Sequence, residues 1–266
     1  MAKRIRIGAL ISGSGTNLKA IIDACRDGRI HGDLVFVGAD RPEAPGFRWA
    51  TENQIPTFCV DYRDIIRQYR EKPEQVPVPG PGDLEASISR QQIFPATASA
   101  DRVRAFFTTR LAAERQLLAK MAAYPFDLLV LAGFMRNLTP YFIDSINTDL
   151  MHPRIMNIHP ALLPAFPGID GYGDTFRYGC KVGGCTVHFV DYGEDSGPII
   201  AQKSFVIRPA DTLETIRRRG LEIEWKLYPR CVQWFAQNRL QIERVTHALS
   251  GGKRHVRTIV RLLPSS

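Results

Sequence analysis

The run Asp127–Gly133 (DLLVLAG) is the sequence feature that most constrains the fold. It is apolar without a break from Leu128 to Ala132, as is typical of a central strand covered by helices on both faces of a parallel sheet. In the first half of the chain, apolar strand patterns alternate with one-faced helical patterns, and that order favours parallel pairing. The sequence therefore predicts an α/β fold with a mostly parallel central sheet.

The first strand–turn–helix unit carries a glycine-rich turn. An apolar strand over 5–11 is followed by the sequence SGSGTN (residues 12–17), and then by a helix that stops near Gly28. Free backbone N–H groups at a helix start bind phosphate. The turn matches neither the GxGxxG dinucleotide pattern nor the GKS/T nucleotide pattern, so it favours a monophosphate. The alternative is a tight turn without a ligand.

A strand predicted over 154–158 leads into the sequence Asn157-Ile158-His159-Pro160. Residues two apart in a strand point to one face, so Asn157 and His159 lie side by side. Pro160, which has no N–H, ends the strand, at the edge where open α/β sheets bind ligands. An amide and an imidazole can both donate to a carbonyl oxygen that gains negative charge, so the pair suits acyl transfer. The alternative is that Asn157 caps a turn and His159 is a hydrogen-bonded core histidine.

Residues 62–105 interrupt the α/β pattern. The stretch 72–83 is rich in proline and glycine, which predicts an extended surface loop. The regular pattern resumes with a helix over 109–123 and the central strand. We expect 62–105 to be an insertion and not a second domain; it is a lid, an oligomer contact or a segment without a particular role.

The second half of the chain carries several further elements. Clustered glycines between 168 and 184 predict a mobile loop, which active sites often use as a cover. Strands over 185–190 and 199–207 flank a turn with two carboxylates, Glu194 and Asp195. A long amphipathic helix from Asp211 is expected to end or kink at Pro229. The basic residues after about 242 are expected to form a loosely held tail.

The composition of the chain indicates which kinds of ligand it can bind and in which compartment it works. The net charge of +8 favours anionic ligands. Five cysteines without CxxC pairing indicate reduced thiols in a cytoplasmic protein, and six histidines without an HExxH pattern indicate no metal site. No apolar stretch approaches the length of a membrane span or signal peptide. Aromatic residues are only scattered over the basic segments, so we do not expect nucleic acid as a partner.

Five sequence blocks in order identify a resemblance. ISGSGTNLKAII, DLLVLAGFMRNL, NIHPALLPAFPG, TVHFVDYGEDSGPIIAQ and EIEWKLYP make the chain similar to the folate-dependent formyltransferases, most closely those that act on glycinamide ribonucleotide in purine synthesis. The resemblance implies a Rossmann-like fold with helices on both faces of the sheet. It implies a formyltransferase domain over 1–242 with an insertion at about 62–105, and a basic tail over 243–266. The implied formyl donor is 10-formyltetrahydrofolate, and the expected assembly is a monomer or a homodimer.

The resemblance also implies roles for individual residues. Asn157 and protonated His159 stabilise the oxyanion on the migrating formyl group, while Asp195 holds the imidazolium and helps a proton move from the attacking amine to the leaving nitrogen. The alternative for Asp195 is an Asx turn, and for the implied arginines it is a solvated charge. The implied substrate-binding residues are Gly15, Thr16, Asn17 and Glu224, and the implied folate-binding residues are Arg110, Met135, Arg136, Asn137 and Leu138.

Two departures from the family pattern leave the amine substrate open. Asp170, Gly171 and Tyr172 stand where close relatives usually carry a histidine, and the proline-rich insertion is unusual. The alternatives are a formyltransferase for an amino-sugar nucleotide, a formyltetrahydrofolate deformylase, or a non-catalytic relative that binds folate or nucleic acid. A methionyl-tRNA formyltransferase would need an added C-terminal domain and a deformylase an N-terminal regulatory domain, and we expect neither here.

Overall fold

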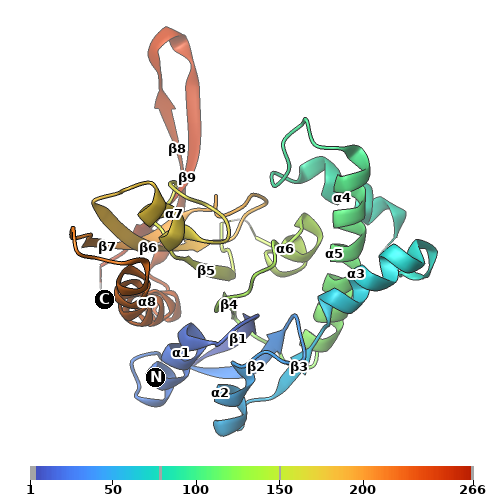
Figure 1. The fold of residues 1–266 in the computed structure, drawn as a ribbon, viewed down its shortest axis with the longest axis horizontal. Helices are drawn as coiled ribbons and strands as arrows, with labels where there is room; N and C mark the ends of the chain where they lie inside the picture. Colours follow the sequence, from blue (N-terminus) through green and yellow to red (C-terminus); the bar gives the residue numbers. More distant parts are fainter. Residues whose placement is uncertain (1–3, 78–79, 150, 265–266) are drawn as a thin grey trace.

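A seven-stranded sheet runs through the molecule in the order β3-β2-β1-β4-β5-β6-β7 (Figure 1). This computed structural model describes residues 4–77, 80–149 and 151–264. Strands β1 to β5 pair in parallel, and β6 pairs antiparallel with both β5 and β7, so the predicted mostly parallel sheet is confirmed. The strands are β1 (Ile5–Ile11), β2 (Gly32–Ala39), β3 (Thr57–Cys59), β4 (Leu128–Leu131), β5 (Ile155–His159), β6 (Val182–Phe189) and β7 (Ile199–Val206).

Helices cover both faces of this sheet (Figure 1). On one face, α1 (Thr16–Arg26), α2 (Phe47–Glu52) and α8 (Leu213–Ala236) bury their apolar sides against the sheet. On the other face, α3 (Tyr62–Glu71), α5 (Ala100–Met121) and α6 (Pro140–Ile146) do the same. β4 lies between the two layers and all four of its residues are buried, as its unbroken apolar sequence predicts.

Helix α8 also fixes the ends of the two strands that lead to the site. The buried Tyr228 hydroxyl donates to the carbonyl of Met156 at 2.7 Å and lies 3.2 Å from that of Leu131. One side chain therefore ties α8 to both β4 and β5. The helix continues past Pro229 to Ala236, so of the two predicted outcomes, an end or a kink, the helix does not end there.

The segment 62–105 is more regular than its sequence suggests. Helix α3 begins at Tyr62, and Asp61 caps it by accepting from the backbone N–H groups of residues 63 and 64. A short 3-10 turn (Pro73–Gln75) and helix α4 (Pro81–Arg90) follow, and α5 begins at Ala100, nine residues before the predicted start. Leu84 of α4 and Phe107 of α5 share a small apolar cluster. Of the extended loop predicted over 72–83, residues 73–75 and 81–83 are helical, and residues 78–79 lie outside the described residues.

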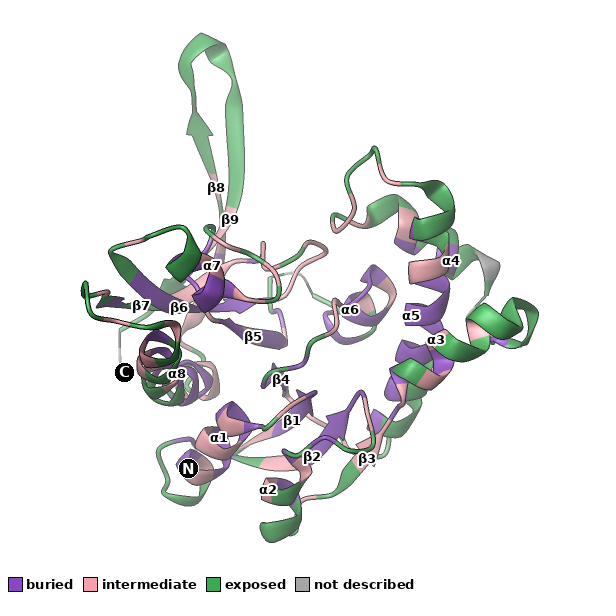
Figure 2. Ribbon diagram, in the orientation of Figure 1, coloured by how far each residue is buried: buried purple, intermediate pink, exposed green. Residues whose placement is uncertain are grey.

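Two other stretches also form regular structure where loops were predicted. Helix α7 (Gly171–Arg177), whose first turn is capped by Asp170, occupies the middle of the glycine-rich stretch, and Gly183 and Gly184 lie within β6. Residues 240–262 form an antiparallel hairpin of β8 (Leu240–Ala248) and β9 (Arg254–Leu262), joined by a 3-10 turn (Ser250–Gly252). Figure 2 shows this hairpin projecting from the body with its outer half exposed. Residues 243–262 thus belong to a hairpin where a loosely held tail was predicted over 243–266, and residues 265–266 of that prediction lie outside the described residues.

No helix in the described ranges is long and apolar enough to cross a membrane. The five cysteines are free thiols. Among the described residues, no three histidine, cysteine, aspartate or glutamate side chains group as a metal site.

Candidate active site

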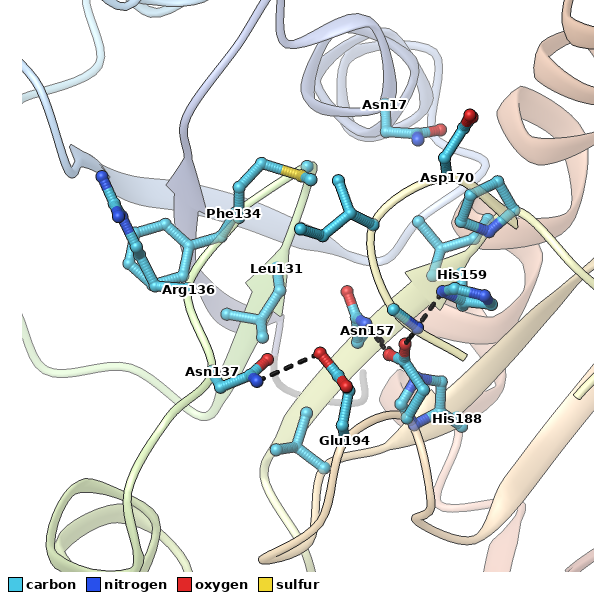
Figure 3. A pocket seen from close by; sticks show the side chains of 18 of the residues that line it. Asn17, Leu131, Phe134, Arg136, Asn137, Asn157, His159, Asp170, His188 and Glu194 are labelled. Atoms are coloured by element: carbon cyan, nitrogen blue, oxygen red, sulfur yellow. Dashed lines mark hydrogen bonds and ion pairs between the residues drawn. The ribbon is translucent and has the colours of Figure 1, made fainter. Parts of the chain in front are cut away.

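A cavity of about 440 Å³ opens at the carboxyl end of β4 and β5. Its walls come from residues within 133–138, 157–160, 168–172 and 188–195, together with Asn17 of α1 and three residues of α8. Asn157 and His159, two apart on β5, both line it, as the strand alternation predicts. Figure 3 shows these two side chains on the same side of the cavity as His188, with Glu194 near Asn157 and Asn137 across from them. Residues of β5, of β6 and of the loop after β4 therefore line one cavity.

The turn between β6 and β7 carries Asp195 into this cavity. Gly197 permits the turn to come close, because a Cβ at that position would lie 1.9 Å from the carbonyl oxygen of Phe189. Asp195 itself has a φ of 50°, in the left-handed region that costs free energy for a residue with a side chain. Such a backbone persists where surrounding contacts hold it, and this one places the carboxylate against His159.

His159 and Asp195 form a nearly buried ion pair. His159 Nδ1 lies 3.0 Å from Asp195 Oδ2, and the two side chains are only 3% and 13% exposed. The other ring nitrogen, Nε2, lies 2.7 Å from the carbonyl oxygen of Phe166. Both ring nitrogens thus face acceptors, an arrangement that only the doubly protonated imidazolium satisfies with two N–H donors.

The pKa values of the pair follow from these contacts. Burial acts to lower the pKa of His159, but the hydrogen bond and charge of Asp195, the Phe166 carbonyl and the charge of Glu224 together raise it above the ordinary histidine value. Burial acts to raise the pKa of Asp195, but bonds to His159 and His188 and the N–H of Gly168 hold it well below its usual range. These contacts therefore favour an imidazolium beside an ionised carboxylate.

Asn157 lies next to this pair. Its Nδ2 is 3.4 Å from Asp195 Oδ1 and 3.3 Å from His188 Nε2. His188 Nδ1 lies 2.9 Å from the carbonyl oxygen of Phe189, and its Nε2 lies 3.6 Å from Asp195 Oδ1. Both contacts of the amide are near the outer limit for a hydrogen bond. The amide hydrogens are therefore available to a stronger acceptor in the cavity.

The loop after β4 forms the opposite wall, as the sequence predicts for Met135, Arg136, Asn137 and Leu138. The Arg136 guanidinium pairs with the buried carboxylate of Asp40 and lies 5.3 Å from the ring centre of Tyr62. Asn137 Nδ2 donates to Glu194 Oε1 at 3.1 Å. This bond joins the loop after β4 to the turn that carries Asp195 (Figure 3).

Arg110 is the one predicted site residue that the structure places away from the cavities described. Its side chain is buried on α5, with its guanidinium 5.2 Å from the ring centre of Tyr62 and 4.8 Å from that of Phe106. Burial lowers the pKa of this guanidinium. It does not line either cavity in the described part of the chain. The folate contact that the resemblance implies for Arg110 stays a prediction.

The glycine-rich turn lines a second cavity of about 420 Å³ next to the first. Gly15 precedes α1 with a φ of 67°, and a Cβ there would also lie 2.9 Å from the Cα of Gly46. Glycine is required at this position for both reasons. The N–H groups that begin α1 face the same region as Thr16 and Asn17, an arrangement suited to a phosphate.

Asn17 and Glu224 connect the two cavities. Asn17 lines both of them, and its Nδ2 donates to Glu224 Oε2 at 2.7 Å. The Tyr172 hydroxyl donates to the other oxygen of Glu224 at 2.6 Å. Burial raises the pKa of Glu224, and the bonds from Tyr172 and Asn17 act against that rise. The predicted substrate-binding residues thus lie together beside the predicted catalytic ones.

The chain is similar to known proteins over most of its length. The formyl transferase family matches residues 5–232 of the chain. The chain belongs to this family. Among curated relatives, a phosphoribosylglycinamide formyltransferase of Haemophilus influenzae is 31% identical over 238 residues, which cover 90% of each chain. One from Mycobacterium tuberculosis is 34% identical over 80% of this chain and 77% of its own.

Solved structures agree. A glycinamide ribonucleotide transformylase from Symbiobacterium toebii is 34% identical, and the match has a TM-score of 0.72 and covers 99% of this chain and 96% of that one. A phosphoribosylglycinamide formyltransferase from Coxiella burnetii, solved in complex with CHES, is 28% identical with a TM-score of 0.67. The implied Rossmann-like formyltransferase fold is confirmed.

Three residues of this formyl transferase site were not predicted from the sequence. His188 lies opposite Asn157 in the antiparallel pair of β5 and β6, and the direction of that pair was the missing information. Glu194 was noted only as a turn carboxylate, although its proximity in sequence to Asp195 was a usable signal. Tyr172 was noted only as a departure from the family pattern, and its bond to Glu224 depends on the packing of α7 against α8.

Proposed function

We propose that the chain transfers the formyl group of 10-formyltetrahydrofolate to the amine of glycinamide ribonucleotide. The observation that carries this proposal is the ion pair of His159 and Asp195, with the amide of Asn157 beside it, at the wall of one cavity. The names and extent of the relatives support the choice of substrates. The cavity's position next to a glycine-rich helix start suits a substrate that carries both an amine and a phosphate.

In the proposed reaction the amine nitrogen attacks the formyl carbon, and the formyl oxygen becomes an oxyanion. An Asn157 N–H replaces one of its long contacts with a bond to that oxygen. The His159 imidazolium stabilises the same charge at short range, and its Nε2–H reaches the oxyanion when it leaves the Phe166 carbonyl. Donors fixed near a developing charge in a site shielded from water are worth much more than donors in water.

The proton balance assigns a role to Asp195. The attacking amine loses one proton as the new C–N bond forms, and the folate nitrogen gains one as the old C–N bond breaks. Asp195, kept ionised by His159 and His188, accepts the proton through a water molecule and returns it to the leaving nitrogen. The reaction then needs no covalent intermediate with the enzyme.

Substrate binding divides between the two cavities. The phosphate of the ribonucleotide lies at the start of α1, on the N–H groups of Gly15, Thr16 and Asn17, and Glu224 accepts from hydroxyl or amide donors of the same substrate. Residues 135–138 contact the folate. Arg110 would act on the folate indirectly. It packs on the ring of Tyr62, which also lies against Arg136.

The test is a formyl-transfer assay with glycinamide ribonucleotide and a 10-formyl folate. We expect His159→Ala and Asp195→Asn each to lose about 10²–10⁴-fold in kcat, because each removes a group that acts in the transition state. His152→Ala is a matched control, since its side chain is 83% exposed and pairs with Asp149. Release of formate by the wild type without formylated product would indicate a deformylase instead. Unchanged rates in both variants would falsify the site assignment.

A further inference from the structure

The segment that follows α4 reaches across to the turn that carries Asp195. The backbone N–H of Gln92 donates to the carbonyl of Tyr192 at 3.0 Å, and Gln92 forms an isolated bridge with Gly193. A Cβ on Gly193 would lie 3.6 Å from that of Gln92. The unusual segment of the chain, residues 80–98, is thus in backbone contact with the turn 191–197.

Arg90, the last residue of α4, makes a second connection to the same turn. Its Nη1 lies 2.6 Å from Asp144 Oδ2 of α6, and its guanidinium lies 5.6 Å from the ring centre of Tyr192. The Tyr192 hydroxyl donates to the other oxygen of Asp144. Arg90, Asp144 and Tyr192 therefore form one closed network, which joins α4 and α6 to the first residues of the turn.

The turn 191–197 depends on such contacts from outside. Asp191 Oδ1 accepts from the Gly193 N–H and from the Ser196 hydroxyl, which closes the turn on itself. Arg257 of the hairpin donates to the Ser196 carbonyl at 2.9 Å. The positive φ of Asp195 has a free-energy cost, and a conformation of that kind persists only where neighbouring structure holds it.

We propose that Arg90 and the backbone N–H of Gln92 are positioning residues, which hold the turn 191–197 so that the Asp195 carboxylate stays against His159. The inference rests on the proposed function, because it assigns the segment a part in the same reaction. Residues 80–98 then support the turn that carries Asp195, and are neither a separate lid nor a surface loop without a role. Neither Arg90 nor Gln92 touches the reacting atoms, and both act through Tyr192.

The first arm of the test is kinetic. We expect Arg90→Ala to lose about tenfold in kcat, because small misplacements of a catalytic group are costly, and Arg90→Lys, which keeps the charge beside Asp144, to recover part of the loss. Arg104→Ala is the matched control: it lies in the same part of the chain, is 55% exposed and pairs with Glu85 away from the turn. Gln92→Pro removes the hydrogen bond from the Gln92 N–H to the Tyr192 carbonyl and leaves Arg90 in place, and it is expected to act in the same direction.

The second arm reads the His159–Asp195 pair directly, by NMR titration of the His159 ring in wild type, Arg90→Ala and Arg104→Ala. Asp195, the Phe166 carbonyl and Glu224 raise the pKa of His159 against the effect of burial, and His188 faces Asp195 from the other side. A displaced turn weakens the contact with Asp195, so we expect the midpoint to move to lower pH in Arg90→Ala only.

The two arms separate the possible failures. A lower kcat with an unmoved midpoint, or a moved midpoint with an unchanged kcat, overturns the inference and leaves the proposed function standing. If the wild type transfers no formyl group, the proposed function fails, and the titration alone then decides whether Arg90 positions Asp195. Melting curves of each variant exclude general unfolding as the cause.

Discussion

The charge of His159 is set by what faces its two ring nitrogens, a carboxylate on one side and a backbone carbonyl on the other. Burial alone would favour the neutral ring. Because Asp195 and the Phe166 carbonyl outweigh burial, the folded-state pKa of His159 lies above its usual value. The surroundings of the ring therefore favour its cationic form, which donates from both nitrogens.

The rate of formyl transfer should depend on pH through this ring. Since the active form is the imidazolium, kcat should be lost as the pH rises through the raised pKa of His159. Removing the negative charge in Asp195→Asn should move the alkaline limb of the residual activity to lower pH, and a pH profile of kcat measures this. An alkaline limb at the same pH in wild type and Asp195→Asn would contradict the assignment of that limb to His159.

The same pair affects stability with opposite signs at the two ends of the pH range. The folded-state pKa of His159 is raised, so its stabilisation is complete below the ordinary histidine value near 6.5 and is lost as the pH rises through the folded value. The folded-state pKa of Asp195 is lowered, so its stabilisation is present above about 3.9 and is lost as the pH falls through the folded value.

Single residues also mark the limit of what the sequence predicts. Asn157 and His159 follow from strand alternation, and the structure places both at the cavity. Asp195 came only from the family resemblance, because no local pattern brings residues 36 positions apart together. His188 was not predicted, because its position opposite Asn157 depends on the antiparallel pairing of β5 and β6, which the sequence does not show. Arg110 was placed by analogy, whereas aromatic packing on α5 keeps it away from the cavity.

Among the elements, the turn 191–197 packs especially closely against the end of β6. We predict that Gly197→Ala destabilises the fold by about 1–3 kcal/mol and lowers kcat, because the added methyl would meet the Phe189 carbonyl at 1.9 Å and force the turn outward. Denaturant unfolding measures the first effect and the formyl-transfer assay the second.

Gly82→Ala is the matched control for this substitution. Nothing lies within 4 Å of a Cβ there, and Gly82 is in the first turn of α4, so alanine should leave stability unchanged or raise it slightly. Equal stability and equal activity of Gly197→Ala and Gly82→Ala would show that the turn does not need to lie so close to β6.

Strands and helices were predicted correctly where their buried residues form a clear apolar pattern in the sequence, and were missed where few residues are buried. β1 and β4 are apolar over nearly their full length and were predicted, with β4 slightly too long. Helix α3 buries only Tyr62 and Ile65 in ten residues, too few to show a helical period. The hairpin 240–262 alternates weakly among basic residues, and its outer half is exposed, so its sequence has little that distinguishes a strand from a tail.

At the scale of the whole molecule, the fold brings four separate stretches of chain together around the two cavities. β1 delivers the glycine-rich turn, β4 the loop 133–138, and β5 with the turn after β6 the groups Asn157, His159 and Asp195. Two adjacent cavities that share Asn17 result. This arrangement allows a phosphorylated amine and a folate to approach one point from two sides.

The central claim is that His159 and Asp195 act as one unit on a single formyl group. A double-mutant cycle tests it most directly, with kcat measured for His159→Ala, Asp195→Ala and the double variant. Groups that act as a unit are strongly non-additive, so the double variant should lose about as much as the more damaging single variant. If the two losses multiply instead, the residues act independently, and the proposed mechanism is wrong.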